Sequence, residues 1–586
     1  MKKFLVLIFV MFFAFVLVGC TEKKPDGSTL QSITISGKSS LKVGDEVTYT
    51  TTFTPADFAN KAVKWSTSDE TKLVIDQTGK ATAKAPSEQV YVYATSEAVS
   101  TVKGQRKIVI KEGGNNETGE YPNLQGYTIR IAQAETNLHD FDPFLEGYKQ
   151  SNKAAKQQAW RDVESLFNCT IEVAAYPSSA EWGPSRWNYI LNQAQLGISD
   201  YDFLTVPDSK IPTFVEGGAL HSMEEFYVLH GNNMMDPSFI TSGSYQGNLY
   251  SFNTDKNNIY NVMYYNIGLL ETLQQYNEEL QEPARIFLDG EWTFEKFEDY
   301  CQEVQDTMAQ AFGAAGTAGD AGQEYWAVSG WDSYWWVGLS SNDGEPLADT
   351  TAMTININTP HKVQAAEVVK NLYTKKLAAT PQSVDQNVTQ WNEGKALFNT
   401  GDLWFVKADN RWSSTLWGED TRYGYVPWPR ANDVDFDEIQ VALGGTATWV
   451  MPIGRDYSQY GEECTTENIY WAIAELYKRT DELFKSDETY DPIAEQNKLA
   501  AKFADSEDSQ AAYIYMQDLI QEGKGYFDPL VTSDNSVGSL YTNSTGRTTI
   551  KGAVTQYCAT GAVGTWEEAI AALVPVLQES LRKAFS

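Results

Sequence analysis

From Gln125 onward, apolar runs of strand length alternate with segments whose apolar residues follow helical spacing. This pattern is typical of a parallel, doubly wound α/β sheet. Ligands of such sheets bind at the carboxyl ends of the strands. Glu135 follows the first predicted strand and Asp208 follows the third, so we expect both carboxylates on one rim. The predicted strands are 126–132, 170–174 and 200–206, and the predicted helices are 154–167 and 187–195.

The first twenty residues carry an export pattern. Two lysines precede an apolar run at 4–18, which is shorter than the roughly 20 residues of a membrane span, and Leu-Val-Gly then leads into Cys20. These residues resemble a bacterial lipoprotein signal with its lipobox. The resemblance implies a signal peptide at 1–19 and lipid on the Cys20 thiol. A tether at 20–29 would then hold the protein at the extracellular face of the cytoplasmic membrane. An ordinary signal peptide or a short anchor is the alternative.

Charge and cysteine content exclude several classes of function. The formal net charge is −33, which opposes binding of nucleic acid or anionic lipid through a basic surface. The sequence has no CxxC pair and only four histidines, so we expect neither a metal nor a cofactor. The motifs GxSxG, HExxH and GxxxxGK are absent as well. Four cysteines besides Cys20 are expected as buried free thiols, with three pairings as the alternative: Cys169, Cys301, Cys464 and Cys558.

Residues 30–111 are rich in Thr, Ser and Val, and their short runs of alternating polarity predict a small all-β sandwich. Four motifs here resemble the bacterial immunoglobulin-like domain of group two, and the resemblance implies that Trp65 is the core tryptophan. Such a domain serves either as a rigid spacer or as an adhesion module. A flexible acidic linker is expected at 112–123. The motifs are LKVG at 41–44, VKWS at 63–66, VID at 74–76 and GKATA at 79–83.

The segment 391–405 carries a short apolar run at 396–398 between two glycines. The length of the run and its flanking glycines favour a buried strand. Trp404 and Phe405 follow soon after, and their rings either close a core or lie against a ligand.

Seven further motifs follow one another in an order that resembles the extracellular solute-binding proteins of ABC importers, most closely the large maltodextrin-binding type. The resemblance implies a two-lobed α/β clamp of the periplasmic-binding-protein type at 124–586, which binds a solute and has no catalytic residue. Lobe one is expected mostly at 124–261 plus a later portion, and lobe two mostly at 262–442 plus C-terminal helices. The motifs are DFL at 202–204, GGAL at 217–220, YYNIGLL at 264–270, WTFEKF at 292–297, residues 391–405, YGYVPWP at 423–429 and LGGTATWV at 443–450.

The segment GWDSYWW at 330–336 is the candidate sugar platform. If it is helical, Trp331 and Trp335 share one face and Asp332 lies on the neighbouring one. Sugars present apolar C–H faces and a rim of hydroxyls, so a sugar site needs flat rings together with carboxylate or amide groups. Positions carried over from the family add contacts near Asp208 and near 403–405. The full predicted ligand-binding set is Glu135, Asp208, Trp331, Asp332, Trp335, Trp404, Phe405 and Trp449.

Two classes of function follow from these patterns. The first is a lipid-anchored, monomeric binding protein that captures a sugar or oligosaccharide and delivers it to the membrane permease of an ABC importer. Val206-Pro207 stands where relatives carry an aromatic residue, which argues against a maltodextrin ligand. The second is a surface adhesion or glycan-capture lipoprotein in which the Ig-like domain binds.

Two kinds of chemistry are further alternatives. A glycoside hydrolase would use an acid pair such as Asp332 and Glu345, but spacing in the sequence does not bring two acids together in space. An iron site would use Tyr264 and Tyr265, but neighbouring residues of a strand point to opposite faces.

Overall fold

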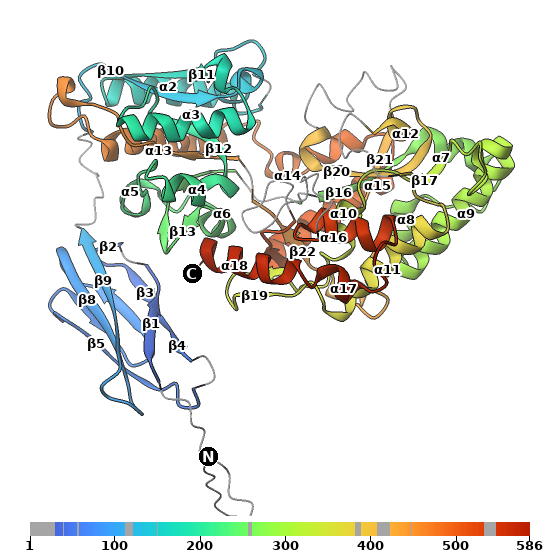
Figure 1. The fold of residues 1–586 in the computed structure, drawn as a ribbon. Helices are drawn as coiled ribbons and strands as arrows, with labels where there is room; N and C mark the ends of the chain where they lie inside the picture. The colour runs from blue at the N-terminus through green and yellow to red at the C-terminus, as the bar shows by residue number, and fades with distance from the viewer. Residues whose placement is uncertain are drawn as a thin grey trace, which may run out of the picture. The chain divides into compact units, whose positions relative to one another are not determined.

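The structure of the protein is a computed structural model (Figure 1), which describes residues 30–38, 40–55, 58–111, 121–148, 150–255, 259, 261–380, 388–406, 422–445, 447–531 and 547–585. The chain divides into two compact units, residues 1–114 and residues 115–586. The predicted signal peptide and the predicted lipidation site Cys20 lie outside the described residues. Within the described ranges, no helix is both long and apolar enough to cross a membrane.

The first unit contains a small β-sandwich, because alternate side chains of its short strands point into one core. Its largest sheet has the strand order β2-β9-β8-β5, and β3-β7-β6 and β1-β4 form smaller sheets. Trp65 on β5 is buried in this core, which confirms its predicted place. The strands are β1 (Ser32–Ser36), β2 (Ser40–Lys42), β3 (Glu46–Thr48), β4 (Thr50–Thr54), β5 (Val63–Thr67), β6 (Leu73–Ile75), β7 (Lys80–Ala83), β8 (Ser87–Ser96) and β9 (Lys103–Lys111).

In the second unit, the first sheet has the strand order β11-β10-β12-β23-β15, and we call this sheet with its helices lobe one. The predicted parallel pairing of the first three strands is confirmed: Ile129 on β10 lies opposite Ile171 on β11, and Ile131 opposite Phe203 on β12. Strand β23 comes from far along the chain and runs antiparallel to β12. The strands are β10 (Tyr127–Gln133), β11 (Cys169–Ala175), β12 (Phe203–Pro207), β15 (Ser251–Phe252) and β23 (Ala447–Val450).

Helices cover both faces of this sheet (Figure 1), so that its central strands are buried on both sides. Trp160 on α2 and Ile473 on α13 pack into the core of one face. Ile190 on α3 and Phe214 on α4 pack into the core of the other. The helices of lobe one are α1 (Leu138–Phe141), α2 (Lys153–Leu166), α3 (Gly183–Leu196), α4 (Ile211–Glu216), α5 (Glu224–His230), α6 (Pro237–Ser242) and α13 (Thr466–Lys485).

The second sheet of this unit has the order β17-β20-β16-β21, and we call it with its helices lobe two. The strand predicted at 396–398 is confirmed and extends through Asp402, with all its residues buried. The strands are β16 (Asn261–Asn266), β17 (Trp326–Val328), β20 (Ala396–Asp402) and β21 (Tyr423–Val426). The helices are α7 (Ile267–Gln274), α8 (Pro283–Leu288), α9 (Phe294–Phe312), α10 (Asp332–Leu339), α11 (Pro360–Thr374), α12 (Thr389–Asn392), α15 (Glu507–Leu519), α16 (Ile550–Val554), α17 (Trp566–Ile570) and α18 (Leu573–Phe585).

The chain passes between the lobes along two segments that touch each other. One runs from β15 to β16 and the other from β22 (Val441–Leu443) to β23. Ile259 and Leu443 form an antiparallel bridge between them. Strand β22 also pairs with β24 (Gly525–Phe527). The buried core of lobe one draws on residues 124–252 and 449–476, and that of lobe two on residues 259–443 and 500–581.

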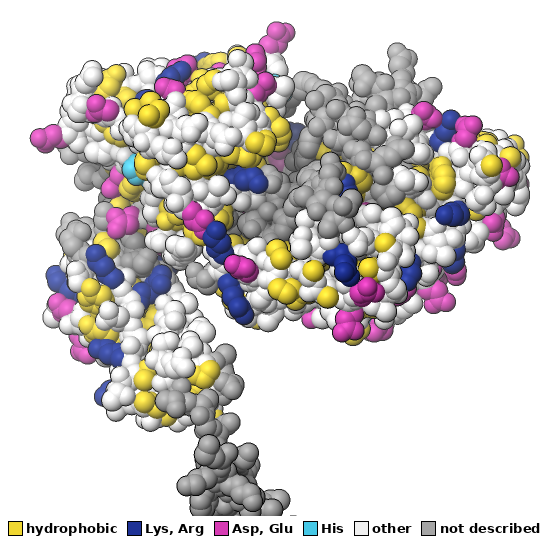
Figure 2. Space-filling view, viewed as in Figure 1, with side chains coloured by type: hydrophobic (Ala, Val, Ile, Leu, Met, Phe, Trp, Pro, Cys, Tyr) yellow, Lys and Arg dark blue, Asp and Glu magenta, His cyan; other side chains and the backbone are white. Residues whose placement is uncertain are grey.

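The state of the cysteines agrees with the prediction from the sequence. All four described cysteines are free and buried, as predicted. On the face that Figure 2 presents, basic side chains are interspersed with acidic ones over the described surface.

Candidate functional site

Two predicted carboxylates follow the parallel strands of lobe one. Glu135 begins the short turn after β10 and is exposed, whereas Asp208 begins the turn after β12 and is buried. The carboxylate of Asp208 packs against Gly445, since a Cβ added there would lie 1.8 Å from Oδ2 of Asp208. Asp208 therefore lies against the second crossing segment, while Glu135 faces solvent.

An aromatic and cationic cluster follows β11, the neighbouring strand, and sequence reasoning missed it as a site. Trp182 is 68% exposed and lies directly before helix α3. The guanidinium carbon of Arg186 lies 4.1 Å from the ring centre of Tyr176 and 5.1 Å from that of Trp182. The ring of Trp187 lies near both Arg186 and Lys210, and Nζ of Lys210 is 5.9 Å from its centre. We call these five residues the edge cluster. The signal in the sequence is EWGPSRW, which comes soon after a predicted strand.

In lobe two, Trp331 lies where β17 ends and α10 begins. It is 8% exposed, and Nζ of Lys551 lies 3.8 Å from its ring centre. This contact is a cation–π interaction, in which the ammonium group covers one face of the indole. Of the predicted platform, Trp331 is thus the residue nearest to the surface.

Asp332 and Trp335 lie deeper, inside the core of lobe two. Residues 330–336 are helical from Asp332 onward, as the platform required, but every residue of α10 is buried. Trp335 stacks on Phe297 with ring centres 5.8 Å apart, and its Nε1 donates to the carbonyl of Ser329 at 2.8 Å. A helix that is buried on all sides is a core element, so Trp335 packs inward whereas Trp331, which precedes the helix, lies nearer to the surface.

Phe405 and Trp449 are also buried in cores. Phe405 lies in the turn after β20, inside lobe two. Trp449 lies on β23 of lobe one, where its ring packs 5.9 Å from that of Phe203 and 5.4 Å from that of Tyr477. The side chain of Trp404 lies outside the described part of the structure. Contact of these three side chains with a solute remains a prediction.

Asn in place of Asp332 is expected to stabilise the protein at neutral pH. Burial raises the pKa of Asp332 from 3.8 to about 6. The protonated form therefore contributes stability that is fully present below pH 3.8 and is lost as the pH rises through 6, in all about 3 kcal/mol. D332N should raise the free energy of unfolding at pH 7.5, and this gain should shrink toward zero at pH 4. The control variant D306N removes a carboxylate that is exposed. An equal effect of D332N at both pH values would contradict the assignment.

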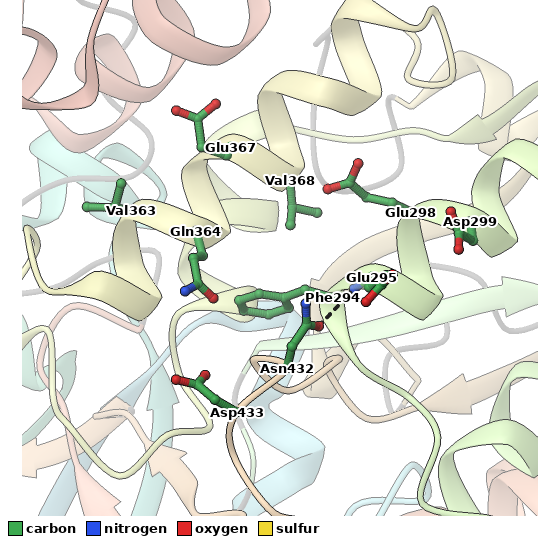
Figure 3. Close-up of a pocket in the computed structure, with 10 residues that line it drawn as sticks. All are labelled: Phe294, Glu295, Glu298, Asp299, Val363, Gln364, Glu367, Val368, Asn432 and Asp433. Atoms are coloured by element: carbon green, nitrogen blue, oxygen red, sulfur yellow. Dashed lines mark hydrogen bonds between the residues drawn. The ribbon is translucent and has the colours of Figure 1, made fainter.

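A groove of about 580 Å³ lies between α9 and α11 of lobe two (Figure 3). Several of its carboxylates are matched by neighbouring side chains: Asp433 lies 3.0 Å from Nε2 of His361, and Glu298 accepts from Nδ2 of Asn371 at 3.0 Å. None of the predicted ligand residues lines it, so the groove is separate from the strand ends. Its lining residues are Phe294, Glu295, Glu298, Asp299, Val363, Gln364, Glu367, Val368, Asn432 and Asp433.

The described residues contain no group of three or more His, Cys, Asp or Glu side chains that would hold a metal ion. Tyr264 and Tyr265, the pair considered for iron, are both buried. Tyr264 donates to the carbonyl of Asp402 at 3.1 Å, and Tyr265 lies 2.7 Å from the hydroxyl of Ser509. Both hydroxyls thus serve hydrogen bonds inside lobe two.

Several solved structures are similar to this chain. The GacH receptor of Streptomyces glaucescens, solved without ligand and with acarbose, is 14% identical; the match covers 78% of this chain and 99% of that one, with a TM-score of 0.46. An ABC substrate-binding protein of Listeria monocytogenes in complex with cycloalternan is 13% identical, with the same coverage and a TM-score of 0.45. UgpB of Mycobacterium tuberculosis in complex with glycerophosphocholine is 13% identical over 78% of this chain and 98% of that one, with a TM-score of 0.47. A comparison with curated proteins finds no match.

Two family models match the sequence. That of the bacterial Ig-like domain, group 2, matches residues 29–105, which include β1 to β8 of the β-sandwich of the first unit. That of the bacterial extracellular solute-binding protein matches residues 133–463, more than half of the chain, and includes the sheet of lobe two, the strands of lobe one from β11 onward and both crossing segments. The chain therefore belongs to the bacterial extracellular solute-binding proteins and carries a group 2 Ig-like domain ahead of its solute-binding unit.

Proposed function

We propose that this protein captures a sugar or oligosaccharide between its two lobes and delivers it to the membrane permease of an ABC importer. The observation that carries the proposal is the exposed ring of Trp182 after β11, at the sheet edge where ligands of α/β folds bind. Tryptophan is highly buried on average, so an exposed ring at this edge needs a reason. A flat ring offers the stacking surface that the C–H face of a sugar requires.

Polar partners for sugar hydroxyls come from neighbouring strands. Glu135 follows β10, which pairs with β11, and Asp208 follows β12. Trp331 would offer a second ring from lobe two, and Trp404 remains a proposed contact from the family pattern. For Asp332, Trp335, Phe405 and Trp449 we propose a supporting part, because their side chains fill the cores behind the strand ends.

The two crossing segments are the proposed hinge. The Ile259–Leu443 bridge ties them near lobe two, and Nδ2 of Asn253 donates to the carbonyl of Ala447 at 3.1 Å near lobe one. Hinge motions concentrate in a few residues at the ends of such strands, while the packed lobes stay rigid. Closure over a solute would bring the strand ends of both lobes onto the same ligand.

We further propose that the protein is a monomer anchored through lipid on Cys20, at the extracellular face of the membrane. The lipobox at the end of the apolar N-terminal run supports this. Alkyne-palmitate labelling should mark the wild-type protein and not the C20A variant. Equal labelling of both would contradict the anchor.

A thermal-shift panel of monosaccharides and oligosaccharides tests the sugar assignment. At a free ligand concentration of 100 times the dissociation constant, a bound solute raises the free energy of unfolding by about 2.7 kcal/mol. We expect at least one saccharide to stabilise the solute-binding unit in this way. Stabilisation by peptides but by no saccharide would contradict the proposal.

A further inference from the structure

Arg186 lies in the first turn of α3, at the edge of the lobe one sheet that carries Trp182. Its side chain is 1% exposed and its guanidinium lies over the rings of Tyr176 and Trp182. Because α3 follows the parallel strand β11, its N-terminus lies at the carboxyl end of the sheet. A buried cation therefore stands at the ligand-binding edge of lobe one.

The guanidinium is incompletely satisfied. Nε donates to the carbonyl of Ala180 at 3.4 Å, but the buried Nη2 has no hydrogen-bond acceptor among the described residues. No carboxylate within the described ranges forms an ion pair with Arg186, and Glu181 acts on it only at longer range. Burial lowers the pKa of Arg186 accordingly. Removing a charge from water without a counter-ion is costly, and stacking on two rings recovers only part of that cost.

The surrounding backbone favours an anion. Helix α3 is 14 residues long, its N-cap residue Trp182 makes no side-chain capping bond, and its first turn holds no acidic residue. Pro184 in the first turn has no N–H, but the other N–H groups of this turn and the helix dipole make such a terminus attractive to negative charge. An added Cβ on Gly183 would meet no described atom within 4 Å, so the terminus has room. Lys210 places a second cation in the edge cluster.

We infer that Arg186 and the N-terminus of α3 form a subsite for an anionic group of the solute: a carboxylate, sulfate or phosphate borne by a saccharide whose ring stacks on Trp182. This inference rests on the proposed function and narrows its substrate class to acidic saccharides. In a chain with a net charge of −33, long-range attraction does not draw in an acidic solute, so specificity for it must come from local groups such as these. Charge-assisted hydrogen bonds from a guanidinium suit all three anions.

The test uses calorimetric titration of the wild-type protein with matched pairs of saccharides that differ in one anionic group. Suitable pairs are cellobiose with cellobiouronic acid, glucose with glucose 6-phosphate, and N-acetylglucosamine with its 6-sulfate, which separate the three anions. We expect the acidic member of at least one pair to bind at least tenfold more tightly than its neutral partner. The R186M variant should lose that preference, and its midpoint of thermal unfolding should not fall. The R161M variant removes an exposed cation from α2 of the same lobe and should keep the preference.

The outcomes separate the inference from the proposed function. Equal affinity for both members of every pair that binds would overturn the anionic subsite and leave the sugar-binding function standing. The subsite would also fall if R186M retained the preference for the acidic member. Failure of all saccharides, neutral and acidic, would overturn the proposed function and the inference together. Stabilisation by inorganic sulfate or phosphate in the wild type but not in R186M, at matched ionic strength in chloride, would support the anion site independently of the sugar.

Discussion

Alanine at Trp335 is expected to lower the free energy of unfolding by about 3–5 kcal/mol, since the substitution empties a tryptophan-sized space in the core of lobe two. The ring is 1% exposed, stacks on Phe297 and meets Trp428 edge to face with ring centres 5.4 Å apart. The substitution also removes the indole donor that satisfies the carbonyl of Ser329. Cavity formation and an unpaired carbonyl act in the same direction.

Denaturant unfolding of W335A and W182A measures this effect under matched conditions. Both variants lose an indole, but one ring is buried and the other is 68% exposed. W182A should stay within about 0.5 kcal/mol of the wild type. If W335A abolished solute binding yet cost less than about 1 kcal/mol of stability, the ring would face the solute and its place in the core would be contradicted.

Alanine at Trp182 is expected to weaken solute binding by about 2 kcal/mol, roughly 30-fold in the dissociation constant. The ring lies directly before α3 and is one of the few large apolar side chains that the described residues leave open to solvent. A stacked aromatic ring is the kind of contact that dominates recognition of a sugar face. Isothermal titration with a saccharide found in the thermal-shift panel measures the loss.

Leu196 supplies the matched control, because it lies at the far end of the same helix and is 72% exposed. L196A removes exposed apolar surface from α3 without touching the edge cluster, so the affinity should not change. Equal losses in both variants would point to a general effect on the helix. Unchanged binding in W182A would remove this ring from the site.

The architecture of both units was predictable because its signals are local. Period-two alternation marks the sandwich, and the strand–helix alternation after Gln125 marks the parallel pairing of β10, β11 and β12. The pairing of β23 with β12 could not be predicted in this way. The two strands lie more than two hundred residues apart in the sequence, and no local pattern indicates an antiparallel pair at that separation. Trp449 on β23 is buried in the core of lobe one, and its contact with a ligand stays a prediction.

The site was harder to predict, because spacing tells which residues share a face and not where that face points. The sequence predicts the helix after Trp331, but every residue of that helix is buried. The family pattern indicates a ligand contact in the turn after the third strand, where Val206-Pro207 stands, and gives no such indication for the turn after the second, which carries Trp182. Only the exposed fraction of the ring separates it from the buried tryptophans.

Hydrogen–deuterium exchange with and without a bound saccharide tests the central claim most directly. If the solute binds at the strand ends of both lobes, exchange should slow in the loop and helix start at 176–186 and in the segment 329–336, with no change in the Ig-like domain at 30–111. Protection confined to 30–111 would contradict the account, and would instead favour a surface adhesin that captures glycans through its Ig-like domain.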